Sequence, residues 1–156
     1  MPSRQIKEIL TASQIIAVVG LSPEPEKASH QVTLYMQKHG YRIVPVNPFV
    51  EKVLGEKSYP SLLEIPAEIQ SDIDVVDIFR RPEDVLPVVK QAVKLREMHG
   101  KPFVIWMQLG IVNADAATLA QDAGFTVVMD KCIMQEHKRL FGKHSRRRSR
   151  PAPEKR

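Results

Sequence analysis

Five short apolar segments, separated by stretches with helical spacing, constrain the fold of this chain more than any other feature. They are IIAVVG (15–20), YRIVPVN (41–47), IDVVDIF (73–79), FVIWM (103–107) and FTVVMD (125–130). Their apolar residues run almost continuously instead of alternating with polar ones, which is typical of parallel strands covered on both faces. The sequence therefore predicts an α/β fold in which these segments form one parallel sheet.

Helical patterns fill the intervals between the apolar segments. Residues 29–39 place apolar and aromatic side chains at i, i+3, i+4 and i+7, which is one face of a helix. Residues 82–98 repeat the pattern, and Pro87 is expected to bend that helix. Asn113 is a candidate N-cap for a helix that runs through Ala120. Two more helices are expected at the ends of the folded part, over residues 3–12 and 131–141.

Glycines at the joints between helices and strands complete the fold prediction. Gly40, Gly100 and Gly124 each follow a helical pattern and precede an apolar segment. Such repeated joints indicate successive β-α units. We therefore expect a Rossmann-like, doubly wound sheet of five parallel strands in the order 3-2-1-4-5, within three layers α/β/α.

The net charge of +5 divides unevenly between two parts of the chain. Residues 143–156 carry seven Lys/Arg and one acid, whereas residues 1–142 hold sixteen Lys/Arg and seventeen Asp/Glu. We expect residues 1–142 to form a single, nearly neutral domain and residues 143–156 to be a disordered basic tail. The tail is interpreted as a solvated terminus, with weak contact to nucleic acid or to an anionic surface as the alternative.

Composition also bears on the compartment. Cys132 is the single cysteine, so the chain cannot form an internal disulfide, and its polar start does not resemble a signal peptide. No apolar stretch is long enough to cross a membrane. These features predict a cytoplasmic protein with no membrane partner.

The loop after the first apolar segment is a candidate phosphate site. A strand, a tight turn at Gly20 and a helix start follow one another, so backbone N–H groups and the helix dipole can meet an anion there. The candidate contacts are Gly20, Leu21, Ser22, Lys27 and Ser29. Only one glycine stands where the G-x-G-x-x-G pattern needs three, which argues against a nicotinamide or flavin dinucleotide.

The ends of the second and third segments add further candidates. Asn47 and Pro48 stand where NAD-binding domains usually carry a carboxylate, and Lys52 follows. A cation there tolerates a phosphorylated ribose, although a solvated loop lysine is the alternative. Arg80 and Arg81 are candidates for a pyrophosphate, unless one of them pairs with a nearby acid of its own chain.

Six blocks, in this order, make the chain resemble the small stand-alone CoA-binding-domain proteins. They are GLSPEPEKASHQV, YRIVPVNP, VLGEKSYPSL, VDIFRRPEDV, IWMQLGI and VVMDKCIMQEH, and the resemblance covers about residues 5–141. Those proteins are similar to the nucleotide-binding domain of the succinyl-CoA synthetase α subunit. The resemblance implies a coenzyme A (CoA) site with the first loop near phosphate. It also implies that Asn47, Pro48 and Lys52 lie by the adenosine and its 3′-phosphate, with Phe79 and Arg80 beside the adenine or pyrophosphate.

Two residues on the later segments have open interpretations. Gln108 either bonds the pantetheine amides of CoA or caps a loop. Cys132 is either a buried structural residue or a thiol able to form a mixed disulfide with pantetheine.

Nothing in the sequence defines a catalytic site. The histidines lack metal-ligand spacing, and no Ser-His-Asp order or paired acids can be identified. The sequence therefore predicts CoA or acyl-CoA binding without catalysis, in a sensor, carrier or regulatory module. The alternative is an NAD(P)- or acyl-CoA-dependent enzyme with an unrecognised active site.

Overall fold

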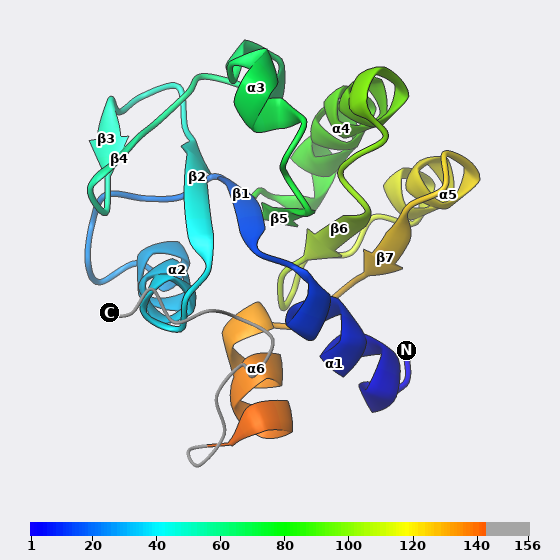
Figure 1. The fold of residues 1–156 in the computed structure, drawn as a ribbon, viewed down its shortest axis with the longest axis horizontal. Helices are drawn as coiled ribbons and strands as arrows, with labels where there is room; N and C mark the ends of the chain where they lie inside the picture. Colours follow the sequence, from blue (N-terminus) through cyan, green and yellow to red (C-terminus); the bar gives the residue numbers. More distant parts are fainter. Residues whose placement is uncertain (143–156) are drawn as a thin grey trace.

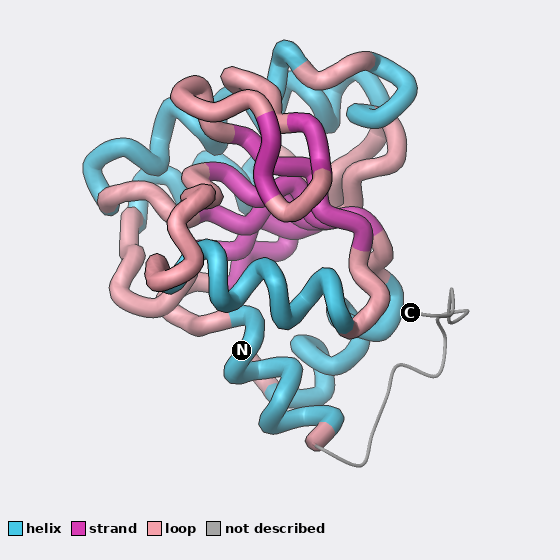
Figure 2. The backbone as a smooth tube through the Cα atoms, turned by 90° about the vertical axis from the view of Figure 1, so that its left-hand side faces the viewer, coloured by secondary structure: helices cyan, strands magenta, loops and turns pink. Residues whose placement is uncertain are grey.

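The structure, a computed structural model, describes residues 1–142. A parallel sheet forms the centre and helices cover both of its faces (Figure 1; Figure 2). The predicted basic tail, residues 143–156, lies outside the described residues. In chain order the elements are α1 (Ser3–Ala12), β1 (Ile15–Val19), α2 (Ala28–Lys38), β2 (Arg42–Val46), β3 (Lys52–Val53), β4 (Glu56–Lys57), the 3-10 turn η1 (Leu62–Glu64), α3 (Ala67–Gln70), β5 (Val75–Ile78), the 3-10 turn η2 (Pro82–Asp84), α4 (Val85–His99), β6 (Val104–Met107), α5 (Ala114–Asp122), β7 (Thr126–Val128) and α6 (Ile133–Phe141).

Two apolar cores lie on opposite faces of the sheet. Because successive strand residues point to opposite faces, Ala17 and Val76 join one core, whereas Ile16 and Trp106 join the other. Helices α4 and α5 close the first core, and α1, α2 and α6 close the second (Figure 1). The predicted three-layer α/β/α architecture is confirmed.

The strand order is β2-β1-β5-β6-β7, and all neighbouring pairs are parallel. Tyr59 extends the β2 edge through a single parallel bridge to Val46. If Tyr59 is counted as the third strand, the order begins 3-2-1-4-5, as in the Rossmann-like arrangement that the sequence predicts, and β7 comes sixth. The predicted strand at residues 73–79 is then the fourth in space, because β5 pairs directly with β1.

Two predicted helix features have different outcomes. The Asn113 cap is confirmed, since its side chain accepts a hydrogen bond from the N–H of Ala116 at 2.9 Å. The bend at Pro87 was predicted because the helix was expected to begin at residue 82, and that start is wrong. Residues 82–84 form η2 and α4 begins at Val85, so Pro87 lies in the first helical turn, where its missing N–H has no intrahelical partner to lose.

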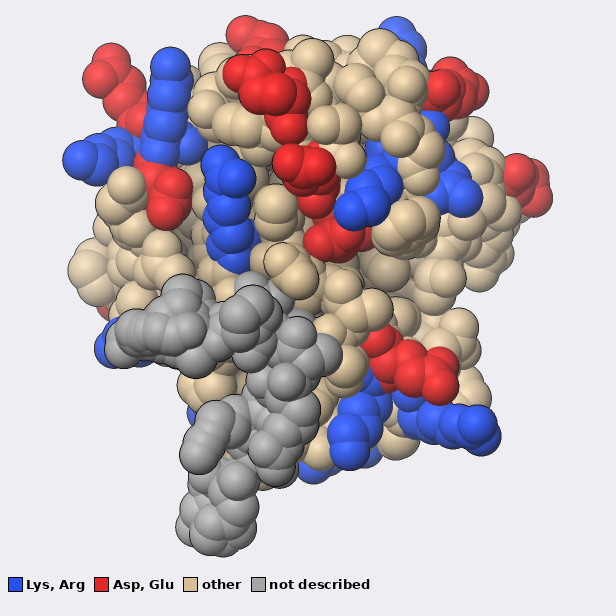
Figure 3. All heavy atoms as spheres, viewed as in Figure 1, with Lys and Arg blue, Asp and Glu red and all other residues tan. Residues whose placement is uncertain are grey.

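Acidic and basic side chains are interspersed on the face of the molecule shown in Figure 3, in keeping with the near-neutral charge of residues 1–142. Of the helices within residues 1–142, none is both long and apolar enough to cross a bilayer.

Candidate functional site

Three strand ends meet closely at Gly20, at the carboxyl edge of the sheet. The Gly20 N–H donates to the carbonyl of Val46 at the end of β2, at 2.9 Å. A Cβ atom on Gly20 would lie 2.3 Å from the carbonyl oxygen of Phe79, after β5, and Gly20 has a φ of +90°. Only glycine fits this position without moving the backbone, so the turn at Gly20 fixes how near the loops after β1, β2 and β5 come to one another.

The loop after β1 is held in shape by side chains from the start of α2. Ser29 is buried, and its Oγ accepts a hydrogen bond from the N–H of Ser22 at 2.9 Å. The Nδ1 atom of His30 lies 3.0 Å from the Ser22 carbonyl oxygen, to which it can donate. Lys27 is the exposed N-cap residue of α2. Two of the predicted phosphate-loop residues, Ser22 and Ser29, are therefore engaged with each other and hold the loop against the helix.

Asn47 connects the first two loops. Its Nδ2 donates to the Leu21 carbonyl at 2.9 Å, and its Oδ1 accepts from the N–H of Phe49 at 2.8 Å. The Ser58 hydroxyl donates to the Asn47 carbonyl at 3.1 Å. Both ends of the Asn47 amide are thus occupied, and this side chain positions the loops on either side of it.

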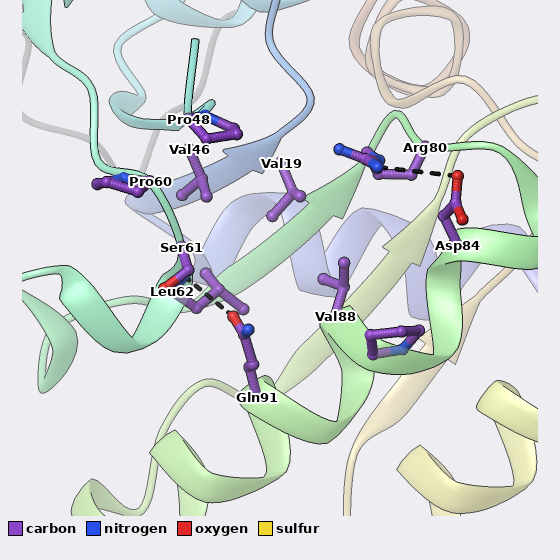
Figure 4. A pocket seen from close by; sticks show the side chains of 11 residues that line it. Val19, Val46, Pro48, Pro60, Ser61, Leu62, Arg80, Asp84, Val88 and Gln91 are labelled. Carbon is purple, nitrogen blue, oxygen red and sulfur yellow. Dashed lines mark hydrogen bonds and ion pairs between the residues drawn. The ribbon is translucent and has the colours of Figure 1, made fainter. Parts of the chain in front are cut away.

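Two adjoining cavities open at this edge. The first, of about 320 Å³, is lined by Gly20, Asn47, Pro48, Phe49, Phe79, Arg80, Arg81 and Asp84. The second, of about 210 Å³, is lined by Val19, Val46, Pro48, Pro60, Ser61, Leu62, Arg80, Asp84, Pro87, Val88 and Gln91, and most of its walls are apolar (Figure 4). We call the first the polar cavity and the second the apolar slot. They share Pro48, Arg80 and Asp84.

The arginines of the polar cavity have acidic neighbours at different distances. Arg81 Nε lies 3.0 Å from Asp84 Oδ2 and 3.6 Å from Glu83 Oε2, and its hydrogen bond to Asp84 raises the pKa of Arg81. Arg80 Nη2 is 3.7 Å from Asp84 Oδ2. This longer separation, at a half-exposed side chain, leaves the Arg80 guanidinium able to turn toward an anion.

Six predicted contacts line the polar cavity: Gly20, Asn47, Pro48, Phe79, Arg80 and Arg81. The other six do not line either cavity: Leu21, Ser22, Lys27, Ser29, Lys52 and Gln108. Gln108 is buried, and its Oε1 accepts from the N–H of Ile133 at 3.1 Å, which matches the alternative of a capping role. Lys52 is exposed on the small β3-β4 hairpin, opposite Lys57.

Several lining residues were missed by the sequence analysis. Phe49 is 88% exposed beside the polar cavity, and an aromatic residue directly after Asn47-Pro48 was a signal that could have found it. Ser61 and Gln91 line the apolar slot from η1 and α4. They are 30 residues apart in the chain, and no local pattern indicates that they meet.

Among the titratable groups away from the cavities, Asp77 and His137 have pKa values shifted mainly by burial. Burial raises the pKa of Asp77 well above its usual range, and its Oδ1 atom has no hydrogen-bond partner among residues 1–142. Burial and the nearby His39 lower the pKa of His137 to about 4. Within residues 1–142, no cluster of three or more histidine, cysteine or acidic side chains is arranged to hold a metal ion.

Comparison with known proteins assigns the chain to a family. A model of the CoA binding domain matches residues 14–138. The chain belongs to the CoA-binding domain family. It is 42% identical to the uncharacterized protein YneT of Bacillus subtilis over 137 residues, which are 87% of this chain and 95% of YneT.

The chain is also similar to solved structures and to parts of larger enzymes. The solved structure of a hypothetical protein from Pyrococcus horikoshii superimposes with a TM-score of 0.82 at 42% identity, covering 91% of this chain and 94% of that one. The ADP-forming acetate–CoA ligase II of Archaeoglobus fulgidus is 32% identical over 81 residues, 51% of this chain but 12% of the ligase. The match to the ligase thus spans a small part of the larger enzyme.

Proposed function

We propose that this protein binds coenzyme A or an acyl-CoA at the carboxyl edge of the sheet and acts without catalysis as a sensor, carrier or regulatory module. The observation that carries the proposal is the junction of the polar cavity with the apolar slot at Arg80. A nucleotide has the same two-part character, since a flat, weakly polar base is joined to charged phosphates. Membership of the CoA-binding domain family supports CoA as that nucleotide.

The diphosphate belongs in the polar cavity under this proposal. Arg80 supplies a charge that can turn from Asp84 to a phosphate oxygen, and Arg81 lies beside it. Charge-assisted hydrogen bonds of this kind are about twice as strong as neutral ones. The loop held by Ser22 and Ser29 leads into the N-terminus of α2, where the first N–H groups have no intrahelical acceptor.

The 3′-phosphate of CoA is assigned to the β3-β4 hairpin. Lys52 and Lys57 are directly paired across the hairpin and are both exposed. Two like charges at paired positions repel each other, and an anion between them would relieve that repulsion. The hairpin follows Asn47 and Pro48, which line the polar cavity.

Isothermal titration of the full chain with CoA, dephospho-CoA and NAD tests the proposal. We expect CoA to bind most tightly, dephospho-CoA more weakly because it lacks the 3′-phosphate, and NAD most weakly. Equal affinities for CoA and dephospho-CoA would show that the hairpin lysines do not bind the 3′-phosphate. Absence of CoA binding would reject the proposed function, and turnover of acyl-CoA by the purified chain would reject its non-catalytic part.

A further inference from the structure

The two outer strands of the sheet, β2 and β7, are protected differently. Beside β2, the Tyr59 N–H donates to the carbonyl of Pro45 at 3.1 Å, and the Tyr59 carbonyl accepts from the N–H of Asn47 at 2.9 Å. Pro45 itself has no N–H to offer. On the other side of the sheet, none of residues 1–142 pairs with the outer side of β7 (Figure 1). An open outer strand is a template for pairing with another chain.

The sequence of β7 does nothing to block such pairing. Thr126, Val127 and Val128 are uncharged and include no proline, and the first two are partly exposed. Asp130 is the nearest charged residue along the chain, and its Oδ1 accepts from the N–H of Gly110 at 2.7 Å. Charge and proline are the usual means by which outer strands avoid pairing, and β7 has neither.

The backbone groups on the outer side of β7 follow from its ladder with β6. The Thr126 N–H donates to the carbonyl of Phe103 at 3.0 Å, so residues 126 and 128 face β6. The residues between and beside them face away from the sheet. The outer side of β7 therefore offers the N–H groups of Val127 and Met129 as donors, and the carbonyls of Phe125 and Val127 as acceptors.

We infer that β7 pairs antiparallel with β7 of a second copy of this chain, about a two-fold axis at Val127. Two Val127 residues that stand opposite each other exchange both of their hydrogen bonds. In the same register Met129 stands opposite Phe125 of the second copy, and its N–H meets that carbonyl. The Phe125 N–H is not needed, because it donates to the carbonyl of Ala120 at 3.0 Å. The outer side of β7 is thus self-complementary, as a two-fold interface requires.

Helix α5 is placed to extend this interface. It connects β6 to β7 and contacts β7. Neighbouring strands lie about 4.8 Å apart, so pairing of the two β7 strands brings the two α5 helices to about 10 Å, a usual spacing for packed helices. In a right-handed crossover, the flank of α5 that faces beyond β7 carries only uncharged residues. They are Ala114, Ala117, Thr118 and Gln121.

The pairing has a consequence for the candidate site. Two five-stranded sheets become one continuous sheet, and its antiparallel junction points the two carboxyl edges in opposite directions. The dimer would therefore present two separate sites at opposite ends. The inference itself does not depend on what those sites bind.

Sedimentation velocity of the full chain over a range of concentrations, combined with amide hydrogen exchange, tests this inference. We expect a species of twice the 17.7 kDa chain mass, and slow exchange at Val127 and Met129 that becomes fast on dilution. Val127→Pro removes an outward N–H and spares the β6 ladder, so it should raise the dimer dissociation constant about tenfold to a hundredfold. Gln121→Lys places like charges on the two α5 helices and should also weaken the dimer. Gln31→Lys, on the exposed surface of α2, is the matched control and should leave the dimer unchanged.

A monomer at every concentration would overturn the inference. So would a dimer that neither Val127→Pro nor Gln121→Lys weakens, because it would use another surface. Slow exchange at Val127 in a monomer would assign the outer side of β7 to another segment of the same chain, which also overturns the inference. If Val127→Pro does not fold, Gln121→Lys and the wild-type exchange pattern still decide between these outcomes.

Discussion

At the amino edge of the sheet, the Asp74 carboxylate has three short contacts with donors of its own chain, whereas at the carboxyl edge the Arg80 guanidinium has one longer contact with an acid. Asp74 accepts from the N–H groups of Gln14 and Ile15 at 2.8 and 3.0 Å, and from Lys101 Nζ at 2.8 Å. Arg80 has an acidic neighbour at 3.7 Å and faces two cavities. A charge with several short contacts stabilises the fold, and a charge with one long contact beside a cavity has capacity left for a ligand.

The largest expected effect comes from closing the space at Gly20. In Gly20→Ala the new Cβ would lie 2.3 Å from the Phe79 carbonyl oxygen, so the strand ends must separate. We expect a loss of about 3–5 kcal/mol in the free energy of unfolding, measured by urea denaturation, and loss of CoA binding.

Gly55→Ala is the matched control for the positive φ alone. Gly55 has a φ of +79°, and a Cβ there would meet nothing within 4 Å. We expect it to cost about 1 kcal/mol. If the two variants are equally destabilised, the cost at Gly20 comes from its positive φ and not from its close contact with the Phe79 carbonyl.

Asp74→Asn should be the next most damaging change, and only to stability. One side-chain oxygen becomes an NH₂ group, so the side chain at position 74 loses its charge and one of the two oxygens that accept from the three donors around it. We expect a loss of about 2–3 kcal/mol by urea denaturation, with the CoA affinity unchanged. A parallel fall in CoA affinity would contradict the separation of the two edges.

Asp77→Asn provides the contrasting buried carboxyl. Asp77 lies three residues further along the chain, and its Oδ1 atom has no hydrogen-bond partner in the part of the chain that the structure describes. Because burial raises the pKa of Asp77, the ionised form is disfavoured in the fold, and the variant should be at least as stable as wild type at pH 7. Destabilisation similar to that of Asp74→Asn would show that Asp77 has a structural role that its surroundings do not reveal.

Arg80→Gln should act on binding instead of stability. Removing the guanidinium deletes a charge-assisted contact with phosphate, so we expect about tenfold to a hundredfold weaker CoA binding by isothermal titration. Its half-exposed pair with Asp84 is a minor term in stability, so the free energy of unfolding should change by less than about 1 kcal/mol. Arg4→Gln, which breaks an exposed pair with Glu8, should change neither quantity.

A region away from both edges should set the response to acid. His137 is a buried residue of α6, and its Nδ1 lies 2.8 Å from the hydroxyl of Tyr35 on α2. Its folded pKa of about 4 is below the ordinary value of 6.5, so the unfolded chain binds the proton first as the pH falls. Stability should therefore decrease between about pH 6.5 and 4, by at most about 1.4 kcal/mol per pH unit from this group.

The same pH series on His137→Gln isolates that contribution. The variant keeps a side chain able to bond Tyr35 but removes the titrating group. Its stability should vary less steeply with pH over this interval than that of wild type. An identical slope would assign the acid response to other groups.

The smallest expected effect concerns the hairpin lysines. Lys52→Ala and Lys57→Ala should each reduce the preference for CoA over dephospho-CoA by a few-fold, because exposed ion pairs contribute about 1 kcal/mol or less. Lys90→Ala, on the exposed surface of α4, is the control and should leave the preference unchanged. If both hairpin variants keep the wild-type preference for CoA over dephospho-CoA, the hairpin does not bind the 3′-phosphate.

Much of the fold could be predicted because its signals are local. Continuous apolar segments identified the main strands, and Asn113 identified a helix start through a contact three residues away. The edge pairing at Tyr59 escaped prediction because it rests on one bridge within a Pro- and Ser-containing segment that does not resemble a strand. If Tyr59 in this segment is counted as a strand, β5 is the fourth strand across the sheet.

Part of the candidate site follows from where the strands end. Gly20 and Asn47 directly follow β1 and β2, and Arg80 stands two residues after β5, so the parallel sheet brings them to one edge. The apolar slot was not predictable, because it forms only when η1 packs on α4 and brings Ser61 near Gln91. Contacts between residues that far apart depend on tertiary packing, which periodicity does not encode.

Amide chemical-shift mapping of the full chain by NMR, during titration with CoA, tests the difference between the two edges most directly. The account predicts the largest shifts at Gly20, Phe49 and Arg80, and none of similar size at Ile15 or Phe103 on the amino edge. Shifts concentrated at the amino edge, with the Gly20 and Arg80 amides unmoved at saturation, would contradict it.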